Sequence, residues 1–401
     1  MGFVVNSRIS YNIEEMKKFW NYVKKYKIRF SFLLGLIVLL GLLIGLRYIP
    51  EVSEFWTTTI GRAYQTVVGF ISSIFPWSIF ETLIIVAIAG GVSWIVFFII
   101  KTKKDGFKES SIRIVNLVLV IVSIVTLYVG TAGMAYHRKP MNLALKADGV
   151  EDSQYYDISI WATKKLNECA SQLEFDENGQ VKRPYSNSKL YEIISNEYAR
   201  IDSDYLTKFT AKPKQLILFG WLYTELNISG VTFLPTGESN YNQNVPNIDI
   251  PFVIAHELAH TKGVMNETEA NNLAMYVCMN SSDPYLQYSA LSNAYESLEP
   301  MAMTANDENM LNDFYNLLDD RVWKDFAYSN DFWSKHTFFK DLSKWFNDLY
   351  LEVFGSQNTD AYNDHIDDDI IIVDDEPMFV LYSLSPYQEI VVDYWLKENG
   401  H

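Results

Sequence analysis

The sequence predicts a mainly α-helical protein in which N-terminal transmembrane helices precede an α+β domain with a small sheet and a helical C-terminal part. Two observations carry this prediction. Nearly all long apolar runs of the 401-residue chain lie in its first third. Residues 1–139 carry 16 Lys and Arg against 7 Asp and Glu, a net of +9, whereas residues 140–401 carry 17 against 42, a net of −25. Opposite charges indicate two parts in different environments, a membrane domain over 1–139 and a larger domain over 140–401.

Three runs in the membrane domain are long enough to cross a bilayer, which takes about 20 apolar residues. They cover residues 30–46, 77–100 and 114–136, and the second has one charge, Glu81, near its start. The first run follows a hydrophilic lead and lacks a clear small-residue cleavage site. We therefore expect it to be a retained span rather than a cleaved signal peptide.

Basic residues predict the orientation of these spans. Residues 17–29 carry six Lys and Arg, and the loop 101–113 carries five, whereas the loop between the first two spans has only Arg47 and Arg62. Because cytoplasmic loops are enriched in Lys and Arg, the N-terminus and the loop 101–113 are expected in the cytoplasm. Three crossings then place the larger domain outside the cytoplasm.

The remaining segments suit short helices and a strand. Residues 60–75 mix polar and aromatic side chains, and we expect them to lie on the membrane surface before the second span. Residues 157–174 and 187–202 have the apolar spacing of amphipathic helices. Residues 229–244 (SGVTFLPTGESNYNQN) are predicted to form a strand that ends in a turn-rich segment. A further helix is expected from Pro251, a residue that suits a first helical turn, and most of the chain after it has helical spacing.

Cysteines and acidic clusters carry weaker signals. Cys169 and Cys278 are too few for a disulfide scaffold, and although an extracytoplasmic location permits one bridge, we expect two buried free thiols. The acidic run 364–376 surrounds a short β-branched segment. Its carboxylates are of the type that calcium takes, but their spacing fits no familiar calcium loop, so a solvated acidic loop is expected. The strongly acidic larger domain disfavours nucleic acid as a partner.

The segment 253–276 (VIAHELAHTKGVMNETEANNLAMY) carries the chemistry. His256 and His260 lie four residues apart, so a helix puts both on one face, where they can bind one ion. Glu257 is rotated by one residue, and its carboxylate can reach the ligand position that water takes. This is the H-E-x-x-H arrangement, in which two histidines hold zinc and the glutamate is the general base. A chance pairing is the alternative, but the chain has only six histidines.

A third ligand is expected after a chain reversal. Gly263 is predicted to stop the first helix in a left-handed conformation, and Asn266 to cap a second. A reversed chain can return a carboxylate to the ion, and we predict Glu269 as the third ligand. Two alternatives remain: Glu269 bonds only the cap, as in a capping box, or Glu267 is the ligand.

The sequence also resembles a known family. The segments FPWSIFETLIIV, LPTGESNYN, PFVIAHELAHTKGVMNETEANNLAMYVC and YLQYSAL are similar to bacterial membrane proteins grouped as domain of unknown function 3810. The similarity extends from about the first span to Leu396, and the acidic run departs from the family's usual C-terminal region. The resemblance implies transmembrane helices followed by a zincin-type, gluzincin-like metallopeptidase domain. It implies Zn²⁺ held by His256, His260 and Glu269, with Glu257 as the base.

Other site residues follow from mechanism. A strand above the metal helix would offer its edge to an extended peptide, and residues 231–242 are placed to form it. Glu238 is then predicted to contact substrate or the residues that surround the metal ligands, with a turn carboxylate as the alternative. The oxyanion of the reaction needs a donor beside the metal. Tyr241, Tyr288 and His336 are candidates, and the sequence does not choose among them.

Together these features predict a membrane-anchored zinc metallopeptidase of the bacterial cell membrane, facing outward and hydrolysing peptide or protein substrates. The alternative from another class is a non-catalytic membrane receptor or assembly factor on a metallopeptidase fold. The presence of Glu257 argues against that alternative, because binding alone needs no base. An intramembrane protease is disfavoured, because no apolar run of about 20 residues contains the motif.

Overall fold

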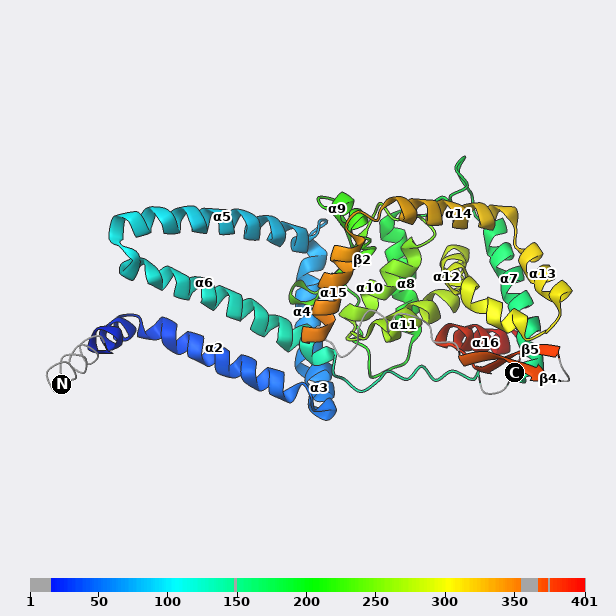
Figure 1. Cartoon of the computed structure of the whole chain (residues 1–401), viewed down its shortest axis with the longest axis horizontal. Helices are drawn as coiled ribbons and strands as arrows, with labels where there is room; N and C mark the ends of the chain where they lie inside the picture. Colours follow the sequence, from blue (N-terminus) through cyan, green and yellow to red (C-terminus); the bar gives the residue numbers. More distant parts are fainter. Residues whose placement is uncertain (1–15, 148–149, 355–366, 374–375, 401) are drawn as a thin grey trace.

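The computed structural model describes residues 16–147, 150–354, 367–373 and 376–400 of the chain. The described part is mainly helical and contains a small mixed sheet and a separate two-stranded sheet. In Figure 1, long helices project from one side of a larger body, and short helices run across their inner ends.

Three helices are long and apolar enough to span a membrane. They are α2 (Lys27–Leu46), α5 (Ile79–Asp105) and α6 (Phe107–Tyr128), the last continued by the π-helical turn η2 (Val129–Gly133). Few of their side chains are buried within the protein. An exposed apolar surface of this kind needs a lipid solvent, so the chain is associated with a membrane, as the three predicted spans require.

A short helical segment links the first and second spans. It consists of α3 (Pro50–Trp56), the π-helical turn η1 (Thr57–Gly61) and α4 (Arg62–Ile74). The face of α4 that bears Gln65, Gly69 and Ser72 is buried, and the Gln65 amide donates to the Leu234 carbonyl at 2.9 Å. The opposite face is apolar and exposed. α4 therefore lies between the ends of the spans and the larger domain (Figure 1).

The larger domain packs helices around a three-stranded sheet. Its helices are η4 (Asp152–Gln154), α7 (Tyr155–Ser171), α8 (Asn187–Arg200), α9 (Gly220–Glu225), η5 (Leu234–Thr236), α10 (Ile250–Thr261), α11 (Glu267–Met279), α12 (Pro284–Met303), α13 (Glu308–Leu317), α14 (Asp320–Lys335), α15 (Lys340–Phe354) and α16 (Pro386–Asn399). Its strands are β1 (Lys214–Leu216), β2 (Gly230–Phe233), β3 (Glu238–Asn242), β4 (Asp367–Val373) and β5 (Glu376–Ser383). The two amphipathic helices predicted near residues 160 and 195 are thus present as α7 and α8.

The sheet has the strand order β1-β3-β2, so β2 lies at an edge. β3 pairs parallel with β1 and antiparallel with β2, in a register that sets Gly230 opposite Tyr241. The predicted strand is present as β2, but part of the turn-rich segment expected after it forms a second strand, β3. The turn between the strands contains Pro235, in η5, and Gly237, which adopts a left-handed conformation with φ of 65°. These two residues split the segment into a hairpin whose first strand packs on α10.

The expected solvated acidic loop at 364–376 is also corrected. Residues 367–373 form β4, which pairs antiparallel with β5, and Ile371 lies opposite Met378. The run of β-branched residues after the three aspartates favours a strand more than the acidic flank disfavours it. Residues 364–366 and 374–375 lie outside the described part.

The main core of the larger domain lies between its helices. Fully buried side chains come from α7, α8, α10, α11, α12 and α16; examples are Leu166, Ile194, Leu258, Leu273, Leu291 and Ile390. Cys169 and Cys278 are both buried free thiols, which confirms the sequence prediction. Two helices of this core, α10 and α11, carry the predicted site.

Two buried carboxylates join the second span to the sheet. Glu81, in the first turn of α5, accepts hydrogen bonds from the backbone amides of Ile217 at 3.0 Å and Phe219 at 2.8 Å. In return, Glu238 of β3 accepts bonds from the first two amides of α5, those of Ile79 and Phe80, both at 2.9 Å. An anion at a helix N-terminus satisfies its free amides and its dipole. The exchange fixes the start of α5 against the larger domain.

Replacing Glu81 or Glu238 by Gln removes the negative charge of the carboxylate. It also replaces one of the two accepting oxygens by an NH₂ group, which cannot accept a hydrogen bond from a backbone amide. We expect each variant to lower the free energy of unfolding by about 1–3 kcal/mol, seen as a lower thermal midpoint of the detergent-solubilised protein. Glu51→Gln is the control, because Glu51 is exposed and forms a surface ion pair with Lys139. If Glu81→Gln and Glu238→Gln both unfolded at the wild-type thermal midpoint, the result would contradict a stabilising contact between α5 and the larger domain.

Candidate metal centre

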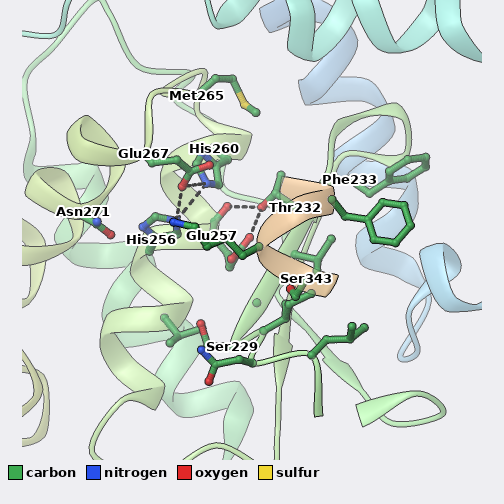
Figure 2. A pocket seen from close by; sticks show the side chains of 18 of the residues that line it. Ser229, Thr232, Phe233, His256, Glu257, His260, Met265, Glu267, Asn271 and Ser343 are labelled. Carbon is green, nitrogen blue, oxygen red and sulfur yellow. Dashed lines mark hydrogen bonds and ion pairs between the residues drawn. The ribbon is translucent and has the colours of Figure 1, made fainter. Parts of the chain in front are cut away.

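α10 presents both histidines on one face. Pro251 occupies its first turn, and its other sides are buried, with Ala255, Leu258 and Ala259 fully inside the core. The four-residue spacing stacks His256 and His260, whose Nε2 atoms lie 3.1 Å apart. Figure 2 shows the two rings directed toward the same point.

A sharp reversal follows α10. Gly263 has φ of 98°, the left-handed conformation predicted for it, and its amide donates to the His260 carbonyl at 3.0 Å. Arg138 donates to the Gly263 carbonyl at 2.9 Å, and a Cβ on Gly263 would stand 2.7 Å from the same guanidinium. Asn266 then caps α11 by accepting from the Glu269 amide at 3.0 Å, as predicted. The N-terminus of α11 is thereby returned to the histidines.

Glu267, the first residue of α11, completes a three-residue cluster. Its Oε2 atom lies 3.2 Å from His256 Nε2 and 3.4 Å from His260 Nε2. Together with Glu267, the two histidines form the one group of metal-type ligands found among the described residues.

The ligand atoms fit a small divalent cation. Two imidazole nitrogens and a carboxylate oxygen converge with separations of 3.1, 3.2 and 3.4 Å. Ligands bound tetrahedrally to zinc at ~2.0–2.1 Å stand about 3.3 Å from one another. The donor set is also of the type that zinc takes in hydrolases, two histidines and a carboxylate.

The predicted third ligand, Glu269, is not part of this cluster, and Glu267 takes its place. Residues advance about 100° per position on an α-helix, so a carboxylate two residues later points to almost the opposite side. Glu269 instead accepts a hydrogen bond from the backbone of Met141. Burial raises its pKa to about 7, against the opposing effects of that bond and of Arg138.

Charge and hydrogen bonding orient the cluster. His260 Nδ1 lies 2.7 Å from the Val264 carbonyl, so this nitrogen carries the proton and Nε2 faces the cluster. Burial alone lowers the pKa of His260, but the carboxylate of Glu267 outweighs it and raises this pKa to about 9. The pKa of Glu267 falls well below its usual range despite burial, because of the two histidines. The site therefore attracts positive charge, and protons and a metal would compete for it.

Glu257 lies beside the cluster and is held by β2. Its Oε2 atom lies 2.7 Å from the Thr232 hydroxyl, which is also 2.8 Å from the Glu257 carbonyl oxygen. A Cβ on Gly230 would stand 2.6 Å from Glu257 Cγ, so only glycine leaves room for this side chain. Burial raises the pKa of Glu257, while His256 and His260 and the Thr232 bond oppose the shift. A carboxylate with a raised pKa suits a general base.

The cluster and Glu257 open into one pocket of about 880 Å³. Its walls come from β2 and the loop before it, from α10 and α11, from α15, and from Tyr128 and Tyr136 near the end of the third span. Apolar and aromatic side chains dominate this lining. A cavity of this size that holds a few converging polar groups is typical of a ligand site.

Four other predicted site residues do not line this pocket. Glu238 caps the start of α5. Tyr241 is buried in the core, and Tyr288 donates to Asp325 at 2.9 Å within the helical layer. His336 Nδ1 lies 2.9 Å from Glu225 at the end of α14. These side chains are of the kinds that bind substrate or an oxyanion, but each one packs or forms hydrogen bonds away from the pocket.

Several residues around the site were missed by sequence reasoning. Thr232 and Gly230 hold Glu257, Arg138 holds the reversal, and Asn271 lines the pocket one turn after Glu267 (Figure 2). A signal existed only for Asn271, which shares the helix face of Glu267 at i+4. The others depend on which strand and which loop approach α10, information that local spacing does not contain.

The matched family agrees with the resemblance seen in the sequence. The family model described as Protein of unknown function (DUF3810) matches residues 56–367, more than half of the chain. This range is shorter than expected, because the first span and the residues after 367 lie outside it. No curated protein and no solved structure matches the chain. The chain belongs to the DUF3810 family of proteins of unknown function.

Proposed function

We propose that this chain is a membrane-anchored, zinc-dependent metallopeptidase that hydrolyses peptide bonds in peptides or proteins. One observation carries the proposal: His256, His260 and Glu267 converge on a single point, and the Glu257 carboxylate lies beside them in the same pocket. A metal site that only stabilised the fold would be closed by a fourth protein ligand. Here the described residues supply three ligands and a neighbouring acid.

The chain's own residues supply positioning and proton transfer. His256, His260 and Glu267 would hold zinc, which when bound lowers the pKa of a water molecule and polarises a carbonyl group. Glu257 takes the proton of the attacking water and passes it to the departing amine. Thr232 fixes the Glu257 carboxylate, and the apolar pocket limits competing solvent.

The position of β2 at the edge of the sheet supports the proposal that the substrate is a polypeptide. Its partner β3 lies on one side only, and residues of β2 line the pocket. An extended peptide can add to such an edge through backbone hydrogen bonds. This pairing would lay the scissile bond of the peptide across the cluster. The strand near residue 231 would then bind substrate, as predicted from the sequence.

We place the larger domain on the extracytoplasmic side of a bacterial cell membrane. The basic residues of the segment 17–29 and of the loop 101–113 support a cytoplasmic location for both segments. With three spans, the chain after α6 then lies outside. The acidic composition of the larger domain is compatible with an extracytoplasmic location, because cytoplasmic loops are the ones enriched in Lys and Arg.

Metal analysis of purified protein tests the ligand set. We expect about one zinc per chain in the wild type, and a strong loss of zinc in His260→Ala and Glu267→Gln. Glu269→Gln is the matched control, because it changes the neighbouring glutamate of the same helix turn and should retain zinc. Loss of zinc in Glu269→Gln with retention in Glu267→Gln would contradict the ligand assignment.

The role of Glu257 is tested by separating binding from catalysis. Glu257→Gln should retain zinc at the wild-type level but cleave a peptide library about 10²–10⁴-fold more slowly, the usual contribution of a general base. Mass spectrometry of the library detects cleavage at any peptide sequence. Wild-type cleavage by Glu257→Gln would contradict the role of this residue as the base. Cleavage by neither protein, together with the same cellular phenotype for wild type and Glu257→Gln, would favour the receptor or assembly factor.

Thiol labelling tests the topology. Cys169 and Cys278 are buried, so a cysteine introduced at an exposed position is labelled selectively. On intact cells, a membrane-impermeant maleimide should label Glu177→Cys in the larger domain and not Lys103→Cys in the last turn of α5. Permeabilised cells should show both labels. The reverse pattern on intact cells would place the larger domain in the cytoplasm.

A further inference from the structure

The helix α15 has its apolar side turned away from the protein. Five apolar residues recur at the spacing i, i+3, i+4, i+7 and i+11, which places them on one stripe. They are Leu342, Trp345, Phe346, Leu349 and Val353, each between 42% and 57% exposed. A surface helix of a water-soluble domain directs such a stripe to the core. α15 shows the opposite arrangement and so needs an apolar neighbour outside the domain.

The opposite face of α15 is polar and forms one wall of the metal pocket. Lys340, Ser343 and Lys344 line that pocket together with β2 and the histidines, and Phe346 lines it from the edge of the stripe. All five stripe residues, Phe346 included, are still at least 42% exposed. Packing inside the protein therefore does not cover the apolar stripe.

The position of α15 indicates what covers the stripe. Arg47, the residue that follows the first span, donates to the Val353 carbonyl at 2.9 Å. α15 also packs against η2, where the third span ends, and Tyr128 of that span lines the same pocket. Figure 1 shows α15 at the inner ends of the spans, where they meet the larger domain. The helix is therefore at the level where the lipid-facing surface of the spans stops.

A second helix at this level shows the same inversion. The buried face of α4 bears Gln65, Gly69 and Ser72. Its exposed face bears Val67, Phe70, Ile71 and Ile74, between 49% and 67% exposed and again at the spacing i, i+3, i+4 and i+7. Residues 75–78 connect α4 directly to the second span, so its apolar face is continuous with a surface that lipid covers.

We propose that α15 is an interfacial helix whose apolar stripe inserts into the bilayer leaflet on the side of the larger domain. Amphipathic helices of this kind lie in the membrane plane with their apolar face in the acyl region and aromatic residues at the headgroup level. Continuity with the spans and with α4 selects lipid as the occupant rather than a second protein.

This position also specifies the substrate class, an inference that rests on the proposed function. Because α15 and Tyr128 form walls of the metal pocket, the pocket is bordered by the bilayer surface. The polypeptide segment that reaches it is then one held close to the membrane, the juxtamembrane segment of a membrane-inserted chain.

Spin labels on single introduced cysteines test the docking of α15 in the full chain reconstituted into phosphatidylcholine vesicles. Leu349→Cys samples the stripe, Lys344→Cys samples a position about 140° around the same helix, and Glu177→Cys samples the aqueous side of the larger domain. Collisions with oxygen report lipid, and collisions with a water-soluble nickel complex report solvent. This measurement does not require zinc or peptidase activity.

The label at 349 should show a several-fold higher ratio of oxygen to nickel collisions than the label at 344, and a higher ratio still than the label at 177. Equal ratios at 349 and 177 would overturn the proposal by placing the stripe in water. A label at 349 shielded from both reagents would also overturn it, in favour of a protein partner or a second copy. Trp345→Cys repeats the measurement if the first variant does not fold.

The substrate class is tested with reporters that carry a transmembrane anchor and one cleavable segment. The segment is placed either directly after the anchor or behind a long flexible spacer. Several-fold faster cleavage of the juxtamembrane segment by co-reconstituted enzyme is expected. Equal cleavage of both reporters would overturn the substrate class alone, whereas cleavage of neither would count against the proposed peptidase function.

Discussion

The reversal between α10 and α11 is the constraint on which the candidate site depends. Two histidines on one helix can face a common point by spacing alone, but a third ligand must come from another element. The left-handed conformation of Gly263 turns the chain in a few residues and sets the first residue of α11 against the imidazoles. Arg138 holds that turn from outside by binding its carbonyl. A side chain at 263 would disturb both the turn and this contact.

The same arginine connects the site to the membrane part. Arg138 forms a two-pronged ion pair with Glu54 of α3, at 2.8 and 3.0 Å. Its guanidinium lies over the Tyr205 ring, 3.5 Å from the centroid. A second connection lies at the start of α5, where Glu81 accepts hydrogen bonds from backbone amides of the larger domain and Glu238 accepts them from the first amides of α5. The spans, the sheet and α10 are therefore linked by charge-assisted bonds that are buried or partly buried. These bonds hold the candidate site at a fixed position relative to the inner ends of the spans.

Local patterns predicted the parts of the molecule whose structure is set locally. The spans follow from run length, α10 from Pro251 and its apolar neighbours, and the cap of α11 from Asn266. The carboxylate beside the histidines was predicted to be Glu269 and is Glu267, because the choice between them depends on the helix face that the reversed chain presents. Sequence spacing alone leaves the angle of that reversal open.

Tertiary contacts explain the other differences. The carboxylate of Glu238 could have bound substrate, but it accepts hydrogen bonds from the free backbone amides at the start of α5. The turn-rich segment predicted after the strand near residue 231 contains a second strand, because Pro235 and Gly237 reverse the chain and allow β3 to pair with β2. Gly230 and Thr232 acquire their roles only when β2 lies against Glu257. In each case the partner is distant in sequence, so no local signal was available.

We propose that His256, His260 and Glu267 hold a zinc ion beside Glu257. Anomalous X-ray scattering on crystals of the full chain, recorded on both sides of the zinc absorption edge, tests it most directly. We expect a single edge-dependent peak within bonding distance, ~2.0–2.2 Å, of both Nε2 atoms and the Glu267 carboxylate. A zinc-loaded crystal with no peak at this point, or with a peak bonded to Glu269, would contradict it.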